Sequence, residues 1–397
     1  MISVAEAQTL CLALVDPLAS ETVPLRDAAG RVLAAPVTAG RAQPPFAASA
    51  MDGYAVRAED CHPGAVLSVV GEAAAGHGWG GQVNPGEAVR IFTGAPVPAG
   101  ADRVVIQEDV TRSGTRITLG DRLDSSTNIR PEGADFPSDF MIAAPRLLRA
   151  SDLALLAAMN AGHVEVTRRP EVAIIATGDE LVMPGETPNP DQIIASNLFA
   201  LKAMIEAAGG RARLLPIARD NEASLMTVYE MAMGADLIVT IGGASVGDHD
   251  MVAQVAARFG LRQSFYKIAM RPGKPLIAGA FGDGTPYLGL PGNPVSAIVC
   301  GHLFLLPMLR AMLGLQDVLP PVLRARLAAP LEGNGPRAHY MRADLTEDET
   351  GRAVTAHDRQ DSALLTVLVR ANALLIRPPH DGPRAAGDVV EVLPLLP

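Results

Sequence analysis

One stretch of sequence, residues 236–250, constrains the fold of this chain more than any other. Leu237–Ile241 is an uninterrupted apolar run, partly β-branched and bounded by turn-forming residues, which predicts a strand buried on both faces. Gly242 and Gly243 follow, and because neither carries a Cβ the backbone there can turn tightly and approach a ligand closely. A helix is then predicted up to Phe259. A strand, a glycine-rich loop and a helix N-terminus in this order form a site for phosphate-like anions, since unpaired N–H groups and the helix dipole point at the loop.

The polar residues of this loop indicate a second kind of ligand. The loop carries a hydroxyl at Ser245, a further glycine at Gly247, and carboxylates at Asp248 and Asp250. Carboxylates are the ligands that Mg²⁺ prefers, so we expect a divalent metal to share the site with the anion. The alternative for any single acid is that it caps a helix.

Predicted strands and helices alternate along residues 169–319. This order predicts an open, mostly parallel α/β sheet with helices on both faces, and such sheets bind ligands outside the carboxyl ends of their strands. The loops at those strand ends are polar and rich in glycine and proline, which indicates one shared site. They cover residues 177–180, 218–220, 242–250, 267–274 and 290–297.

Two groups of opposite charge lie on these predicted loops. Lys267, Arg271 and Lys274 lie close together in a chain whose net charge is −10, and such cations suit an oxyanion. The alternative is a solvated loop that happens to be basic. Glu180 and Asp220 lie on neighbouring loops and suit Mg²⁺. Because the sequence suggests no Ser-His-Asp or Cys-His arrangement and no activated cysteine, it favours electrostatic and metal-assisted transfer at a phosphate linkage over covalent catalysis.

Two helices are predicted in the part of the chain that precedes the α/β region. Ser3 and Glu6 form a capping box that opens a helix to about Leu18. A second helix is predicted from Ser151. We expect the two helices to pack together in one support, with the residues between them forming an insertion.

Two further parts of the chain have the pattern of β structure. Residues 46–135 contain short β-type runs between Gly/Pro turns, and the pattern beyond Pro320 is all-strand, with residues 364–369 among the strands. A chain of 397 residues is expected to form two to four domains. The predicted fold is therefore a multidomain α/β protein. It has a small helical/β support domain (1–42 plus 136–168), a β-rich insertion domain (43–135), a central three-layer α/β/α domain with a mostly parallel sheet (169–319) and a C-terminal β-barrel-like domain (320–397).

Composition excludes several classes of partner. The net charge of −10 and the isoelectric point near 5.3 argue against nucleic acid and against an anionic membrane surface. The sequence has neither a long uninterrupted apolar run nor a secretory signal pattern, so no membrane span is expected. Cys11, Cys61 and Cys300 are scattered and odd in number, which favours a reducing, cytoplasmic location over a disulfide framework.

Six motifs in a fixed order resemble those of one family. They are SAMDGYA (49–55), TGAPVP (93–98), TGDEL (177–181), GG-x-SVG-x-x-D from Gly242, PGKP (272–275) and LPGNPVSA (290–297). Together they resemble the molybdopterin molybdenumtransferase family, that is, MoeA-type proteins and the gephyrin E domain, over essentially the whole chain. The resemblance makes the α/β domain the molybdopterin-binding domain of a four-part, elongated subunit. It also implies a homodimer, with the active cleft between the α/β domain of one subunit and the β-rich domain of the other.

The resemblance further implies a reaction and its partners. Adenylylated molybdopterin and molybdate give molybdenum cofactor and AMP, with Mg²⁺ assisting. Transient contacts with the adenylyltransferase and with acceptor molybdoenzymes are implied as well. Molybdenum prefers sulfur and the three cysteines are scattered, so its soft ligands are expected from the dithiolene of the pterin.

The family pattern also assigns roles to individual residues. Arg271 keeps the positive charge of the lysine that many relatives have at this position, but it changes the geometry. The assigned groups are Arg271, Lys274, Arg342 and Ser362 for molybdate, with Lys267 supporting the anion; Glu180, Asp220 and Asp250 for metal and phosphates; Asp52, Thr93 and Asp135 from the partner subunit; and Pro291 and Pro294 for the pocket loop. The loop residues Gly242, Gly243, Ser245 and Gly247 are assigned to substrate binding by the strand–loop–helix pattern of their own segment.

Two other functions are alternatives to the molybdenumtransferase activity that the resemblance implies. An adenylyltransferase that activates molybdopterin, or a nucleotide pyrophosphatase, could use the same α/β module, but the four-part layout and the SAMDGYA insertion argue against them. A gephyrin-like scaffold would need a separate trimerising domain, for which the chain has no room.

Overall fold

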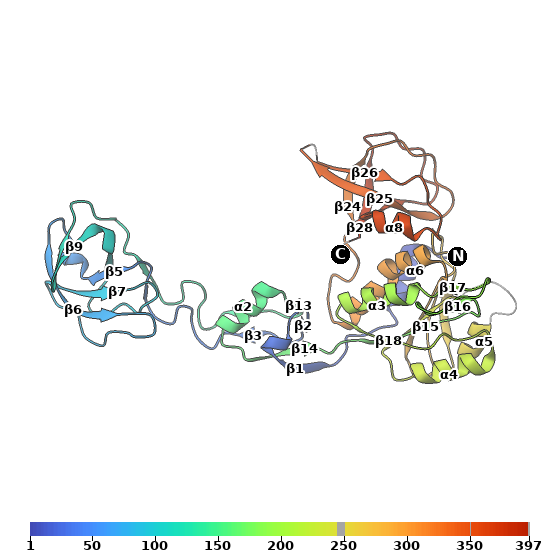
Figure 1. Ribbon diagram of the computed structural model, residues 1–397, viewed down its shortest axis with the longest axis horizontal. Coiled ribbons are helices and arrows are strands. Elements are labelled where there is room, and N and C mark those ends of the chain that lie inside the picture. Colours follow the sequence, from blue (N-terminus) through green and yellow to red (C-terminus); the bar gives the residue numbers. More distant parts are fainter. Residues whose placement is uncertain (244–250, 350, 396–397) are drawn as a thin grey trace.

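The molecule is elongated and built from several separate sheets (Figure 1). The computed structural model describes residues 1–243, 251–349 and 351–395. A β-rich unit lies at one end, a small sheet with α2 (Ala150–Ala158) lies in the middle, and the α/β unit and a C-terminal β unit lie together at the other end. The predicted multidomain α/β architecture is confirmed.

The α/β unit contains a six-stranded sheet whose order is β18-β15-β19-β23-β22-β20. The first four strands in this order are parallel, and β22 is antiparallel to both of its neighbours. All five residues of β19 are buried, as expected for a strand covered on both faces. The strands are β15 (Glu171–Ala176), β18 (Arg211–Leu214), β19 (Leu237–Ile241), β20 (Arg262–Tyr266), β22 (Ile277–Ala280) and β23 (Pro286–Leu290).

Helices cover both faces of this sheet, which gives the predicted three layers. Val172 and Ile174 of β15 pack in one core with α3 (Asn197–Ala207), α6 (Pro294–Cys300) and α7 (Leu306–Met312). The alternate residues of the same strand pack in a second core, on the other face, with α4 (Glu222–Ala232) and α5 (Met251–Arg258). The period of two along the strand thus separates the two cores.

The final helix of the α/β unit is interrupted by a π-helical turn. The helix α6 continues through η4 (Gly301–Leu305) into α7. Pro307 has no N–H group to donate, so the regular ladder cannot run through the junction, and a π turn is one way to accommodate it. By length and composition Pro294–Met312 is the one helix within the described residues that could cross a membrane, but 72% of its most apolar window is buried inside the protein, as in a core helix.

The first helix packs on the α/β unit and not, as was expected, against the helix that starts near Ser151. The helix α1 (Val4–Leu12) starts at Ser3, whose Oγ accepts a hydrogen bond of 3.1 Å from the Glu6 N–H, as the capping box predicts. It ends well before Leu18, whose N–H donates instead to the Met312 carbonyl. Its buried residues belong to the α/β core, whereas α2 packs in a separate core. The predicted pairing of these two helices is therefore wrong, because the apolar face of α1 is covered by α7 and the neighbouring strands.

Strand pairing, rather than helix packing, joins the two halves of the small middle unit. The chain leaves this unit towards the β-rich unit and returns to it on antiparallel strands. The paired strands are β1 (Ser20–Pro24) with β14 (His163–Thr167), β2 (Val32–Leu33) with β13 (Arg146–Leu147) and β14, and β3 (Val37–Thr38) with β12 (Met141–Ile142).

The β-rich unit contains a six-stranded sheet with two apolar cores of its own. A two-stranded pair, β4 (Ala48–Ser49) with β11 (Ile129–Arg130), lies at the base of the unit, where the chain enters and leaves. The sheet order is β8 (Arg103–Ile106), β5 (Gly53–Val56), β7 (Glu87–Ile91), β6 (Val66–Ala73), β10 (Arg116–Leu119) and β9 (Val110–Ser113).

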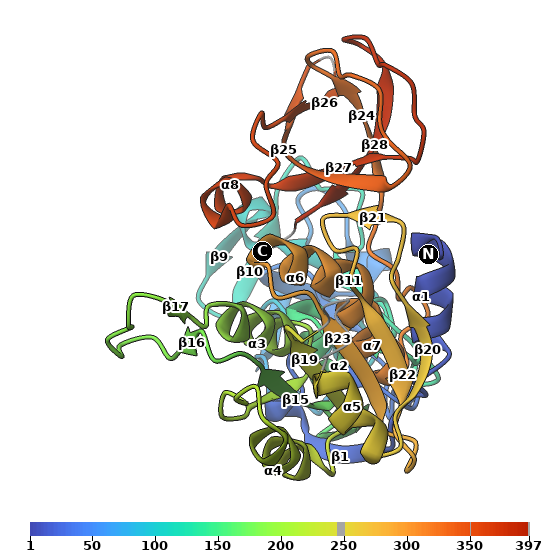
Figure 2. The ribbon, with the colours of Figure 1, turned by 90° about the vertical axis from the view of Figure 1, so that its right-hand side faces the viewer.

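The C-terminal unit is a closed barrel that lies against the α/β unit, with α8 facing α6 (Figure 2). Residues 364–369 were expected to form a strand, and this is wrong: they contribute to α8 (Leu365–Arg370). In that helix Leu368 is buried and Val369 is 83% exposed, a one-sided pattern that a short apolar run cannot reveal. The barrel strands are β24 (Leu323–Leu327), β25 (Ala338–Asp348), β26 (Gly351–Ala356), β27 (Ala373–Arg377) and β28 (Val389–Pro394), joined by β21 (Met270–Arg271) from the α/β unit.

Candidate functional site

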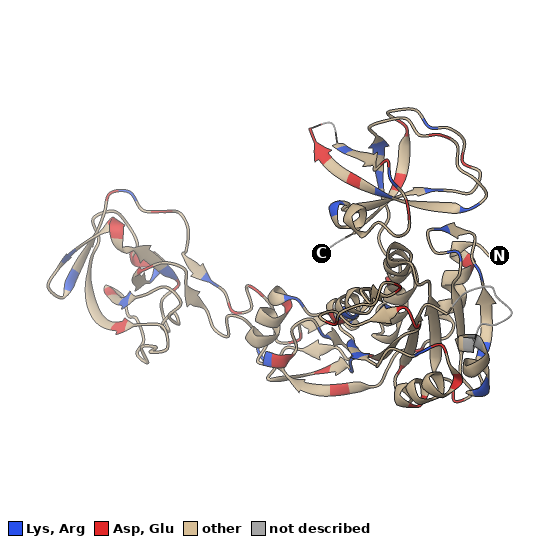
Figure 3. Cartoon of the chain, turned by 45° about the vertical axis from the view of Figure 1, so that its right-hand side comes forward, with Lys and Arg blue, Asp and Glu red and all other residues tan. Residues whose placement is uncertain are grey.

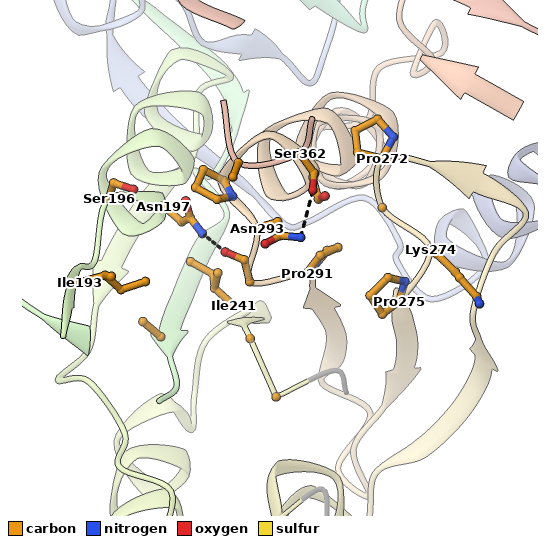
Figure 4. Close-up of a pocket in the computed structure, with 18 of the residues that line it drawn as sticks. Ile193, Ser196, Asn197, Ile241, Pro272, Lys274, Pro275, Pro291, Asn293 and Ser362 are labelled. Atoms are coloured by element: carbon orange, nitrogen blue, oxygen red, sulfur yellow. Dashed lines mark hydrogen bonds between the residues drawn. The ribbon is translucent and has the colours of Figure 1, made fainter. Parts of the chain in front are cut away.

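A cavity of about 1190 Å³ opens at the carboxyl edge of the α/β sheet. Its walls come from the ends of β15, β19 and β23, from the short strand β17 (Ile193–Ile194), and from the barrel. Figure 4 shows Ile193 on one side of this cavity and Lys274 on the other, with Asn293 and Ser362 between them. The cavity lies where the order of strands predicts a ligand site.

The structure brings many of the predicted site residues to this cavity. Asp220 and Lys267 lie on adjoining loops but do not line it, and Arg342 is buried in the barrel wall. Ser245, Gly247 and Asp250 lie outside the described residues. The predicted residues that do line the cavity are Glu180, Gly242, Gly243, Arg271, Lys274, Pro291, Pro294 and Ser362.

The position of Gly243 requires a glycine. Its φ is +64°, a left-handed conformation that side chains with a Cβ rarely adopt. A Cβ at this position would also meet Val252 Cγ2 at 2.3 Å. The backbone at the end of β19 therefore reaches the cavity wall without a side chain in the way.

The loop that carries Glu180 is held by an arginine that the sequence did not point to. The Nη1 group of Arg219 donates to three backbone carbonyls of this loop, those of Gly178, Asp179 and Leu181, at 3.4, 3.2 and 3.0 Å. Arg219 thereby fixes the loop, while the Glu180 carboxylate is left exposed at the cavity wall.

Hydrogen bonds tie the barrel to the loop that follows β23. Asn293 Nδ2 donates to Ser362 Oγ at 3.0 Å, and the Val295 N–H donates to the Ser362 carbonyl at 3.1 Å (Figure 4). Within the α/β unit, Asn197 Nδ2 at the start of α3 donates to the Gly292 carbonyl of the same loop at 2.7 Å. The cavity thus lies at the interface between the α/β unit and the barrel rather than within one of them.

The cationic side of the cavity is built by strand pairing between the α/β unit and the barrel. In the parallel register of β21 with β25, Arg271 lies opposite His339, and Arg271 Nη2 is 2.9 Å from His339 Nδ1. Arg337 and Lys274 also line the cavity. None of these three cations has an ion pair with a described residue, although the chain as a whole is acidic and both signs of charge are mixed over its units (Figure 3).

Arg342 adds a cation with open donors. Its side chain is completely buried, and Nη2 donates to the carbonyl of Asp361, a residue of the cavity wall, at 3.1 Å. Within the described part of the chain Nε and Nη1 have no hydrogen-bond partner. Buried donors without partners are costly, so this arrangement fits a site that an anion completes.

Burial and mutual repulsion act on the protonation of this cluster. Burial, followed by the charge of Arg337, lowers the pKa of Arg271, and burial also lowers the pKa of Arg342. For His339, burial and the surrounding arginines lower the pKa to about 3. The histidine is therefore neutral at physiological pH, and the positive charge of the cluster is carried by arginine and lysine.

Three predicted residues lie away from this cavity. Asp52 accepts hydrogen bonds from the Thr93 N–H and Oγ1, both at 2.7 Å, and these bonds lower the pKa of its carboxyl group. Their loops adjoin β5 and β7, at the opposite end of the molecule (Figure 1). Asp135 is exposed in the segment that returns from the β-rich unit.

The carboxylates of the site fit a magnesium ion in part. Magnesium is usually bound by one or two carboxylates together with ligand phosphates and water. Glu180 lies at the cavity wall, and Asp220 lies on the next loop, where its N–H is 3.2 Å from Asp179 Oδ1. Among the described residues no three metal-binding side chains come together.

Some residues of the cavity could not be found from the sequence. They come from segments without a glycine-rich loop: the first residue of α3, the start of β25 and the segment that precedes α8. They are Asn197, Arg337, His339, Gln360 and Asp361.

Comparisons with known proteins agree along the entire chain. Family models match residues 2–160 (MoeA N-terminal region, domains I and II), 173–311 (probable molybdopterin binding domain) and 324–395 (MoeA C-terminal region, domain IV). The fold and the site thus define a multidomain protein built around a domain of the molybdopterin-binding type.

Individual relatives identify the family. A molybdopterin molybdenumtransferase of Nostoc sp. is 36% identical over 100% of this chain and 94% of its own length. A protein of the same name from Haemophilus influenzae is 34% identical over 95% of this chain and 94% of its own. The crystal structure of a molybdopterin biosynthesis MoeA protein from Pyrococcus horikosii matches with a TM-score of 0.85 and 30% identity over 100% of both chains. The chain belongs to the molybdopterin molybdenumtransferase (MoeA) family, transferases of molybdenum cofactor biosynthesis.

Proposed function

We propose that this enzyme inserts molybdenum from molybdate into adenylylated molybdopterin, with release of AMP and with the assistance of Mg²⁺. The observation that carries the proposal is the cavity between sheet edge and barrel, where cations that have no acidic partner among the described residues face a loop that carries an exposed carboxylate. The two groups match the two parts of the reaction, an oxometalate and a metal-bound phosphate anhydride.

The cationic side suits molybdate, which is a tetrahedral dianion. Arg271 and Lys274 line this side, and Arg342 behind it has two donors without a partner among the described residues. Ser362 is held in place by Asn293 and can offer its hydroxyl. Because the three cysteines are free and two of them are buried, the chain offers no thiolate cluster for molybdenum, which supports the dithiolene of the pterin as its sulfur ligand.

The acidic side suits the phosphate anhydride. Glu180 and Asp220 would hold the magnesium ion, which would neutralise charge on the phosphate oxygens when bound. Asp250 is assigned to the same role and lies outside the described residues. Arg219 keeps the Glu180 loop in position through three carbonyls, so the carboxylate need not reorganise on binding.

The active site is proposed to be composite. Asp52 and Thr93 are hydrogen-bonded to each other, yet their unit lies at the far end of the molecule from its own cavity (Figure 1). In a homodimer with two-fold symmetry the β-rich unit of one subunit can reach the cavity of the other. The free cysteines are consistent with work in a reducing cytoplasm.

The direct test is release of AMP from adenylylated molybdopterin, measured with and without molybdate. We expect the wild type to release AMP only when molybdate is present, and Glu180→Gln to lose most of the rate while its thermal midpoint is kept. A second arm supplies ATP and free molybdopterin, and formation of the adenylylated pterin there would favour the adenylyltransferase alternative. Release that is independent of molybdate would contradict the proposal.

A further inference from the structure

The contact between Arg271 and His339 determines the state of the histidine. A guanidinium group has only donors, so His339 Nδ1, 2.9 Å from Arg271 Nη2, must be the acceptor. An acceptor nitrogen carries no proton. The contact therefore exists only with a neutral ring that carries its proton on Nε2.

The surroundings keep the ring neutral. His339 is 4% exposed and is faced by Arg271, Arg337, Arg342 and Arg377, whose charges together with burial lower its pKa to about 3. Of these four arginines only Arg377 has a carboxylate partner within the described residues, at 2.5 Å from Asp381. The neutral His339 ring thus accepts from Arg271 without adding a negative charge to the cluster of arginines.

We infer that His339 is a positioning residue: it orients the Arg271 guanidinium towards the cavity through an uncharged acceptor, so that the cavity keeps its full positive charge for a doubly charged tetrahedral oxyanion. This inference rests on the proposed function. A carboxylate would hold the arginine more tightly, but it would neutralise one of the charges that the oxyanion needs.

The backbone makes His339 a firm support for this contact. It lies on β25, paired with β27 on one side and with β21 on the other. The backbone of Arg271 is held in the two-residue strand β21 opposite His339, but its side chain is exposed to solvent. A long exposed side chain loses conformational entropy when it is held in one rotamer. Because His339 already restricts the Arg271 side chain, less of this entropy is lost when the ligand binds.

The test compares three variants of the full-length protein by calorimetric titration with molybdate and with tungstate at pH 7. In His339→Asn, Oδ1 takes the place of Nδ1 and stays neutral. His339→Asp has the same shape and carries a charge, and His339→Leu has no acceptor. We expect affinity within about threefold of wild type for Asn, and losses of about tenfold or more for Asp and for Leu.

A double-mutant cycle shows whether the histidine acts through Arg271. In an Arg271→Met background, His339→Leu is expected to cause no further loss of affinity. In the AMP-release assay, His339→Leu should raise the KM for molybdate and leave the rate at saturating molybdate nearly unchanged, which a general loss of structure would not do. Thermal midpoints are measured alongside, and if the Asp variant does not fold, the Asn and Leu variants and the cycle decide.

Each outcome has a separate meaning. If the wild type binds neither oxyanion, the proposed function fails and this inference fails with it. If the wild type binds but the Leu variant binds equally well, or the Asp and Asn variants have equal affinity, only the role of His339 is overturned.

Discussion

Arg342, buried behind the cavity wall, fits a role in ligand binding better than a role in stability. A fully buried guanidinium with two donors that lack partners among the described residues raises the free energy of the ligand-free fold. An anion that accepts from these donors would remove that cost. Unpaired buried charge is tolerated where function requires it, and the same residue is one that the family pattern assigns to molybdate.

Replacing this arginine should separate stability from binding. We expect Arg342→Met to raise the free energy of unfolding of the ligand-free protein by about 1 kcal/mol or more, because a neutral side chain of similar length replaces a buried charge. At molybdate about a hundred times its Kd the wild type should gain about 2.7 kcal/mol, and the variant should gain almost nothing. Denaturant unfolding with and without molybdate measures both effects.

Arg337→Met is the matched control. Arg337 lines the same cavity but is only half-buried, so its removal should weaken oxyanion binding without stabilising the ligand-free protein. A ligand-free Arg342→Met protein less stable than wild type would contradict this account.

Among the elements, β5 connects a motif of the sequence to the packing of a sheet. The strand lies between β7 and β8, and Gly53 within it is part of the SAMDGYA motif. A Cβ at Gly53 would lie 1.9 Å from the carbonyl oxygen of Val105, which belongs to the backbone of β8 and cannot move aside alone. The glycine is therefore required for the two strands to approach each other.

Gly53→Ala should destabilise the β-rich unit selectively. We expect a loss of about 3 kcal/mol or more in the stability of that unit, while molybdate binding at the distant cavity is kept and AMP release is lost. The only tryptophan, Trp79, packs against one of the cores of this unit, so its fluorescence during urea unfolding reports the change. Gly80→Ala, where a Cβ would meet nothing within 4 Å, should leave the midpoint within experimental error.

Local pattern and long-range register explain which features the sequence could predict. The strand Leu237–Ile241, the turn at Gly242 and Gly243, and the N-cap at Ser3 follow from residue types within a few positions, and the structure has them. The packing of α1 on α7, and the helix at Leu365–Arg370, depend on contacts between residues far apart. His339 belongs to the second class, because only the register of β25 with β21 brings it to Arg271.

The same distinction applies to the proposed division into domains. Ends of apolar patterns suggested the boundaries at residues 42, 135, 168 and 319, and these stay a prediction. The residues that the family assigns to the partner subunit could be recognised only through the resemblance, because nothing in the spacing of Asp52 and Asp250 places them together.

For the whole molecule, the elongated shape bears on the proposed composite site, in which two subunits together build one complete site. Asp52 belongs to the β-rich unit and Glu180 to the cavity, at opposite ends of one chain (Figure 1). Variants at these two positions should therefore complement each other in a mixed dimer.

We expect Asp52→Asn and Glu180→Gln to be nearly inactive alone and to regain about one quarter of wild-type AMP release when co-expressed with different tags. Half of the dimers are mixed, and each mixed dimer has one intact site. Glu180→Gln with Lys274→Met is the control, since both changes affect the same wall and no mixed dimer contains an intact cavity. Equal rates in the two mixtures, or no recovery in the first, would mean that the site is not shared between subunits.

The strand β21 links the barrel to the residues that line the cavity. Its two residues sit inside the loop between two strands of the α/β sheet, and they are also hydrogen-bonded to the barrel. The barrel therefore cannot be removed without changing the cavity. A truncation after residue 320 would remove Arg342 and Ser362, and it would also leave the backbone of Arg271 without its partner strand β25. Loss of the barrel should therefore also abolish the proposed oxyanion site. When a ligand fills the cavity, the amide protons of β21 should exchange more slowly.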